Sequence, residues 1–229
     1  TKGAKRSVCE YRITLPYRMA DIETGLLYMV ARSSTEDSKG GDGVEILKNE
    51  PYERGDERGQ FTDKLYHLDS FIPSAVSWLF PKKALRLREV CYNSFPHIET
   101  TYAHGTLSSF YMCVETRVLD GDRGDCENAL GLSRFDLERR KVVQLDLVGT
   151  AMRDKKKFYE PEYDPANITP FQKAPVPCLA QAAKGGDWRQ TVEPVCTVYK
   201  CVTCEIKIHG LSKKITDFAV RKFHDAFLR

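Results

Sequence analysis

Alternation of apolar and polar residues predicts a protein built mainly of β-strands. Segments rich in Val, Thr, Tyr and Ile recur with roughly period-two polarity, which is typical of an antiparallel sheet with one face in water. The charged turn at 53–59 predicts a hairpin between the strands on either side of it. The predicted strands cover residues 8–17, 25–34, 44–52, 59–68, 83–93, 99–104, 107–119, 141–149 and 195–208.

Two further segments predict helices. Residues 74–80, between Pro73 and Pro81, predict a short helix. The C-terminal segment has apolar residues at helical spacing, and Ser212 is a suitable N-cap for a long amphipathic helix. These apolar positions are Leu211, Ile215, Phe218, Ala219 and Phe223. Residues 152–192 show no clear periodicity. The expected fold class is α+β, with a large antiparallel sheet.

Composition excludes several classes of protein. The chain has 229 residues and a net charge of +3, too weak a charge to indicate a nucleic-acid partner. No run of 18 apolar residues predicts a membrane span, and no apolar segment follows the basic N-terminus as in a secretory signal. The eight cysteines are scattered, so we expect them to be reduced in a cytoplasmic protein.

The common enzyme motifs are missing from the sequence. It contains no G-x-S-x-G, P-loop, Rossmann glycine pattern or H-E-x-x-H. Cys201 and Cys204 have C-x-x-C spacing, but they fall in a predicted strand, where residues three apart point to opposite faces. The histidines show no ligand spacing. We therefore expect no catalytic residue, no metal and no cofactor.

The stretch "SWLFPKK" has two interpretations. Trp78, Leu79 and Phe80 end the short predicted helix, and Lys82 and Lys83 follow. A tryptophan beside apolar residues and lysines suits contact with an anionic membrane surface, with the ring at headgroup depth. The alternative is that the ring packs the helix onto the sheet. Composition favours neither.

The strand "GQFTDKLYHL" also has two interpretations. Thr62 and Lys64 are two residues apart and share one face. A lysine in an enclosed space needs an anion or a hydrogen-bonding partner, so the two could grip a phosphate or polyol headgroup. On a solvated edge strand the same pattern would be unremarkable, because exposed lysines are common there.

Several strings occur in one order that resembles the class I phosphatidylinositol transfer proteins. The resemblance covers nearly the whole chain, and the N-E-P-Y and G-Q-aromatic-T-x-K-x-Y-H-L strings are long and specific. The matching strings are "EYRITLP" (10–16), "GLLYMVARSS" (25–34), "GDGVEILKNEPY" (41–52), "GQFTDKLYHLDSFIP" (59–73), "CYNSFPH" (91–97), "DPA" (164–166), "DWRQ" (187–190) and "VYKCVTCEIKIHGLSKKITDF" (198–218).

The resemblance implies a START-like helix-grip fold, in which a curved antiparallel sheet holds one phospholipid against a long C-terminal helix. It implies a monomeric carrier that moves phosphatidylinositol or phosphatidylcholine between membranes without catalysis and without a cofactor other than the bound lipid. Such a carrier is cytoplasmic and associates transiently with membranes. We expect residues 1–229 to form one such domain, lacking the helix that caps the cavity in the family.

The family's pattern also implies individual contacts. Thr62, Lys64 and Asn93 match the residues that bind the inositol headgroup. The residues matched to the lipid phosphate are Thr100, Thr116 and Lys200. Residues 73–87 match the membrane-docking loop, so Trp78, Leu79, Phe80, Lys82 and Lys83 are the expected docking residues.

The chain departs from the family at specific positions. Ile208 and His209 stand where a tryptophan pair is usual, and Leu26 stands where a glutamine near the headgroup is usual. We therefore expect weaker docking and one polar contact fewer. Two alternative functions are a lipid sensor or adaptor that does not transfer lipid, and a START-like enzyme acting on a small hydrophobic substrate.

Overall fold

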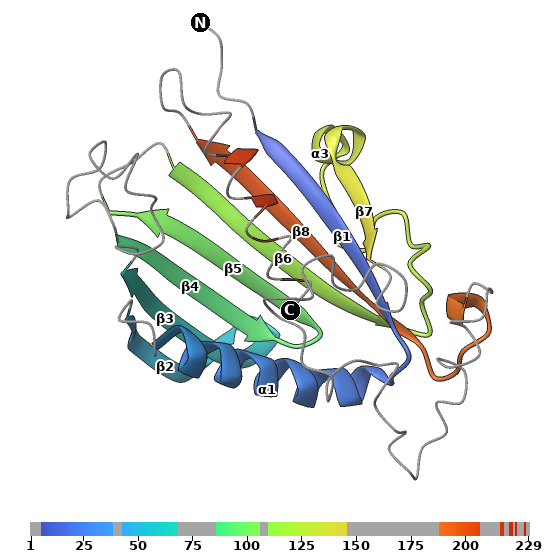
Figure 1. Ribbon diagram of the computed structural model, residues 1–229, viewed down its shortest axis with the longest axis horizontal. Helices are drawn as coiled ribbons and strands as arrows, with labels where there is room; N and C mark the ends of the chain where they lie inside the picture. The colour runs from blue at the N-terminus through green and yellow to red at the C-terminus, as the bar shows by residue number, and fades with distance from the viewer. Residues whose placement is uncertain are drawn as a thin grey trace, which may run out of the picture.

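A large, curved, mostly antiparallel β-sheet dominates the protein (Figure 1). The computed structural model describes residues 6–38, 43–67, 86–105, 110–145 and 188–206, and also 216, 217, 220, 221, 223 and 227. Its eight strands follow the order β2-β3-β4-β5-β6-β8-β1-β7. They are β1 Ser7–Leu15, β2 Val44–Arg54, β3 Glu57–His67, β4 Arg86–Ser94, β5 His97–His104, β6 Phe110–Asp120, β7 Lys141–Leu145 and β8 Cys196–Ile206.

The strand pairing confirms the predicted hairpin and the mostly antiparallel sheet. β2 and β3 form the expected antiparallel hairpin, and Gly55 in its turn has a φ of 64°, which favours glycine. β3 to β6 continue the meander, and β8 lies between β6 and β1. β7 is the exception to the antiparallel expectation, because it pairs with β1 in parallel. The edge strands are therefore β2 and β7.

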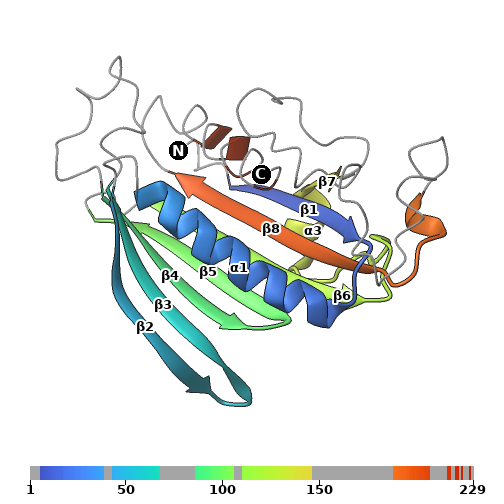
Figure 2. The ribbon, with the colours of Figure 1, turned by 60° about the horizontal axis from the view of Figure 1, so that its bottom comes forward.

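The strand predicted over residues 25–34 is wrong. This segment belongs to α1, a helix that runs over Met19–Ser38. The apolar run from Leu26 to Val30 does not alternate, and such a run suits a half-buried helix as well as a strand. α1 lies across one face of the sheet and contacts β6 and β2 (Figure 2). The helix therefore spans much of that face.

The core lies on the face of the sheet that α1 crosses. Ile22 of α1 is buried in one cluster with Tyr11, Val114 and Val198, and Leu26 packs against the cluster. We call the face that carries these residues the inner face and the opposite one the outer face. In β1 both faces are buried, which explains why its whole middle is inaccessible to water.

The predicted C-terminal helix is described at only six positions, which are helical: 216, 217, 220, 221, 223 and 227. The ring of Phe223 lies 5.6 Å from that of Tyr102, and the ring of Phe227 lies 5.0 Å from that of Tyr11. These rings pack on the inner face. The length of the helix remains a prediction, because most of 207–229 lies outside the described residues.

The short elements were not all predicted. α3 spans Arg134–Arg139, and the short 3-10 helix η3 spans Trp188–Gln190. The helix expected at 74–80 lies outside the described residues. Where the structure is described, it contains no helix long and apolar enough to cross a membrane.

Candidate functional site

The six polar residues predicted to contact a lipid share the inner face of the sheet. Residues directly opposite one another in an antiparallel pair point to the same face, as do residues two apart along a strand. Lys64 lies opposite Glu89, so both lie on one face. The strand register produces three rows, which are Lys64–Glu89–Tyr102–Met112, Thr62–Cys91–Thr100–Val114 and Gln60–Asn93–Ile98–Thr116–Lys200.

Lys64 is buried and paired with a carboxylate. The residue is only 8% exposed, and its Nζ lies 3.5 Å from Glu89 Oε1. The interpretation of Lys64 as a solvated edge residue is therefore wrong, and β2, not β3, is the edge strand. Sequence reasoning had identified the need for an anion at this lysine but had missed Glu89, the protein's own anion.

Glu89 is held by two tyrosines in addition to Lys64. The Tyr66 hydroxyl donates a hydrogen bond to Glu89 Oε2 at 3.0 Å. Burial raises the pKa of Tyr102 well above its ordinary value, and the charge of Glu89 raises this pKa further. Three groups from two strands, β3 and β5, thus converge on one buried carboxylate of β4. This convergence restricts its orientation.

Lys200 lies in a different environment. Its Nζ donates a hydrogen bond to Thr116 Oγ1 at 3.3 Å and lies 5.3 Å from the centre of the Phe227 ring. Burial lowers the pKa of Lys200 to about 8. Among the described residues no carboxylate pairs with Lys200, so an anion brought to this position would favour its charged form.

Cys91 lies in the middle of the polar region. It faces Thr62 on one side and Thr100 on the other, and burial raises the pKa of its thiol. The charge of Lys64 opposes this rise, and Lys200 lies close enough to Cys91 for a thiolate there to raise the pKa of Lys200. Strands β3 and β8 are four strand spacings apart, roughly 19 Å along the sheet. The polar groups therefore form a band across the inner face. We call this group the polar band; its members are Thr62, Lys64, Glu89, Cys91, Asn93, Thr100, Tyr102, Thr116 and Lys200.

Asn93 lies on β4 opposite Gln60 of β3, at a point where the two strands approach each other closely. A Cβ atom at Gly59 would lie 2.0 Å from the backbone oxygen of Asn93. Any side chain at Gly59 would therefore push the Asn93 backbone away. The glycine of the string "GQFT" thus helps to position an asparagine that is distant in sequence.

Comparison with known proteins supports the resemblance found in the sequence. The family model described as "Phosphatidylinositol transfer protein" matches residues 7–229. The chain belongs to this family. It is 34% identical over 222 residues to "Phosphatidylinositol transfer protein 1" of Dictyostelium discoideum, covering 96% of this chain and 81% of that protein. It is 31% identical over 215 residues to the human "Phosphatidylinositol transfer protein beta isoform", covering 91% and 76% respectively.

Three residues of the polar band in this family member were missed in the sequence, although the pattern contained a signal for two of them. Glu89 and Cys91 precede Asn93 at steps of two in "EVCYN", so strand alternation places all three on one face. Tyr102 was missed because its proximity to Glu89 depends on the pairing of β4 with β5.

Leu26, which stands where the family usually has glutamine, lies in α1. It is partly buried and packs against the inner-face cluster. Its side chain cannot form a hydrogen bond, and the loss of a polar contact to the headgroup stays a prediction. The docking residues Trp78, Leu79, Phe80, Lys82 and Lys83 lie outside the described residues, as do Ile208 and His209.

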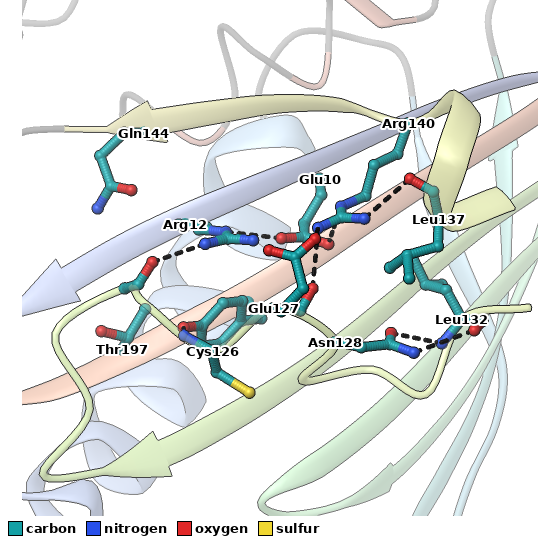
Figure 3. A network of polar contacts seen from close by, with 12 residues as sticks. Glu10, Arg12, Cys126, Glu127, Asn128, Leu132, Leu137, Arg140, Gln144 and Thr197 are labelled. Carbon is teal, nitrogen blue, oxygen red and sulfur yellow. Dashed lines mark hydrogen bonds and ion pairs between the residues drawn. The ribbon is translucent and has the colours of Figure 1, made fainter. Parts of the chain in front are cut away.

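The outer face carries a second buried cluster of charges (Figure 3). Glu10 of β1 accepts a hydrogen bond from Arg12 Nε at 2.7 Å, and Arg140 Nε lies 2.9 Å from the other Glu10 oxygen. Arg12 also donates to the carbonyl of Gly124 at 2.8 Å. Arg140 donates to both the backbone and the side chain of Glu127. The cluster attaches residues 124–140 to the outer face of the sheet.

A neighbouring outer-face pocket has a volume of about 190 Å³. Tyr111, Cys113, Glu115 and Thr203 are among the residues that line it. These side chains alternate with inner-face residues of β6 and β8, so the sheet separates the pocket from the polar band. The pocket is therefore no part of the candidate lipid site.

Proposed function

We propose that this protein binds one phosphatidylinositol or phosphatidylcholine molecule on the inner face and exchanges it between membranes. The observation that carries the proposal is the polar band, an enclosed group of charged and hydroxyl side chains beside an apolar inner-face core. Isolated polar groups in such a place cost free energy unless a partner meets them. A phospholipid headgroup is a suitable partner, and the names of the relatives support this choice.

The apolar surface fits the other half of such a ligand. A two-chain phospholipid has on the order of thirty methylenes, so its release into water would cost on the order of 25 kcal/mol. Leu27 and Val30 of α1 and Ile46 of β2 are exposed large apolar residues, and α1 contacts β2. Acyl chains lying along this surface would remove it from water.

We assign the headgroup contacts by chemistry. Thr62, Lys64 and Asn93 offer hydroxyl, ammonium and amide groups that suit inositol hydroxyls. Thr100, Thr116 and Lys200 would bind the phosphate, because Lys200 has a hydroxyl neighbour and no carboxylate partner among the described residues. Choline cannot donate the hydrogen bonds that inositol hydroxyls donate, so the two headgroups would differ in their dependence on the first three residues.

Exchange between membranes requires contact with them. We propose that Trp78, Leu79, Phe80, Lys82 and Lys83 dock on the bilayer, where the aromatic ring and the ammonium groups suit the interface. In this proposal the protein is a cytoplasmic monomer that associates transiently with membranes and catalyses no covalent reaction.

The test is native mass spectrometry of the purified protein, followed by transfer of labelled phosphatidylinositol between two vesicle populations. A co-purifying phospholipid and saturable transfer support the proposal. Tight binding without transfer would instead favour a lipid sensor or adaptor. Turnover of a small hydrophobic molecule would favour an enzyme, and a protein that takes up no phospholipid from vesicles would refute lipid binding.

A further inference from the structure

The polar band contains more charge than the family-derived contacts include. Lys64 and Glu89 are each only 8% exposed and form an ion pair, and Lys200 lies four strands away. Among the residues that the structure describes, two ammonium groups and one carboxylate leave one net positive charge in the band. Without Glu89 the band would carry two. Glu89 therefore halves the net positive charge available to a headgroup.

We propose that Glu89 sets the charge that the headgroup site tolerates, so that lipids with a single phosphodiester are accepted and phosphomonoester lipids are rejected. This inference rests on the proposed lipid-binding function. A phosphodiester carries one negative charge, which matches the net charge of the band. A phosphomonoester such as that of phosphatidic acid carries about −1.5 to −2 at neutral pH, because its second pKa is about 6.

The geometry explains why the Glu89 carboxylate would repel an additional negative charge instead of rotating away from it. Tyr66 donates to Oε2 of Glu89, and Lys64 lies against Oε1, so both oxygens have fixed partners. Tyr102 encloses the group from the next strand. An additional negative charge brought near Lys64 therefore meets a held carboxylate in a partly dehydrated space, where like charges repel more strongly than in water.

The experiment compares the lipids that each variant takes up from vesicles of phosphatidylcholine that contain a small fraction of phosphatidic acid. The bound lipids are quantified by mass spectrometry. For the Glu89→Gln variant, the ratio of phosphatidic acid to phosphatidylcholine should rise about tenfold, a change of about 1.4 kcal/mol. Combining Glu89→Gln with Lys64→Gln restores the net charge, so the ratio should return to the wild-type value.

The matched control is Glu99→Gln. Glu99 lies on the outer face of β5, where its carboxylate is 3.8 Å from Arg54, so the same loss of charge occurs on the other side of the sheet. This variant should keep the wild-type ratio. An unchanged ratio in the Glu89→Gln variant, with normal uptake of phosphatidylcholine, would overturn the inference and leave the proposed function intact.

A second variant decides the question if the Glu89→Gln variant does not melt cooperatively. Lys64→Gln lowers the net charge of the band to zero, so the ratio of phosphatidic acid to phosphatidylcholine should fall below the wild-type ratio. An unchanged ratio there would also overturn the inference. A wild-type protein that takes up no phospholipid would refute the proposed function itself.

Discussion

The two buried charge clusters of this protein lie on opposite faces of one sheet and differ in how completely the protein neutralises them. On the outer face, Glu10 lies between Arg12 and Arg140 at 2.7 and 2.9 Å. On the inner face, Lys64 and Glu89 are 3.5 Å apart, and Lys200 has only a hydroxyl and a ring as described partners. The outer cluster is closed by short contacts, whereas the inner one contains a lysine with no carboxylate partner among the described residues.

From this difference we infer different tasks for the two clusters. Arginine donates several hydrogen bonds in fixed directions, so Arg12 and Arg140 can join a strand to the backbone of a loop. Lysine carries a compact charge on a flexible stem, which suits an exchangeable ligand. We therefore expect substitutions on the outer face to change stability and substitutions on the inner face to change lipid selection.

The largest effect should come from breaking the outer cluster. Arg140→Ala leaves Glu10, which is 1% exposed, with one partner fewer, and buried charges that lose a partner typically cost about 3–5 kcal/mol. Chemical denaturation should show a loss of this size in the free energy of unfolding. Arg134→Ala, which removes an exposed pair with Glu138, should change it by no more than about 0.5 kcal/mol. Equal small losses in both variants would contradict the comparison.

Lys64→Ala should mainly impair lipid selection. Loss of the ammonium should reduce phosphatidylinositol transfer about tenfold or more, because hydrogen bonds to charged groups contribute about 1.5–3 kcal/mol. Phosphatidylcholine transfer should remain within about twofold of wild type, since choline offers no matching hydroxyl groups. Lys48→Ala is the control, because Lys48 is exposed on the outer face of β2. Equal loss of both transfer activities would indicate a structural role for Lys64.

Lys200 should make lipid binding depend on pH. Its pKa is lowered to about 8 by burial, and a bound phosphate would raise this pKa again. Binding should therefore take up a proton above pH 8, and phosphatidylinositol affinity should fall by up to about tenfold per pH unit as the pH rises above 8. Binding to vesicles measured from pH 7 to pH 9.5 tests this, and Lys200→Met should remove the dependence.

Titration of Lys200 predicts the opposite trend for the stability of the lipid-free protein. Lipid affinity should fall as the pH rises above 8, whereas the free energy of unfolding should rise. Between about pH 8 and the ordinary lysine pKa of about 10.4, the unfolded chain binds more protons at this residue than the folded protein does. The contribution of Lys200 to the free energy of unfolding should therefore rise with pH in this range. Parallel denaturation curves of wild type and the Lys200→Met variant isolate this contribution. A wild-type slope that persists in the variant would assign it to other groups.

The smallest effect should come from a neutral member of the polar band. Thr62→Ala removes one hydroxyl, and an uncharged hydrogen bond contributes about 1 kcal/mol, so phosphatidylinositol transfer should fall about fivefold. Thr62→Ser keeps the hydroxyl and should retain most of the transfer. If the serine variant loses as much phosphatidylinositol transfer as the alanine variant, the methyl group of Thr62 contributes more to transfer than its hydroxyl group does.

Strand periodicity was the part of the fold that could be predicted best. Alternation in β1 places Tyr11 and Arg12 on opposite faces, as the structure shows. It could not show that both faces of β1 are buried, because the covering groups, Ile22 and Arg140, come from distant segments. The prediction of a strand at 25–34 failed for a related reason. Its apolar run has no clear period, and packing against the sheet selects the helix.

Sequence alone determined which residues can share a face, because alternation is a local property of the backbone, and its strings identified the family. It could not determine which charges meet. Lys64 lies opposite Glu89, 25 positions later, only because β3 pairs with β4 in one register, and a one-residue shift would turn Glu89 to the outer face. The tertiary structure therefore decided that Glu10 of one buried cluster lies between two arginines and that Lys200 of the other has no carboxylate partner among the described residues.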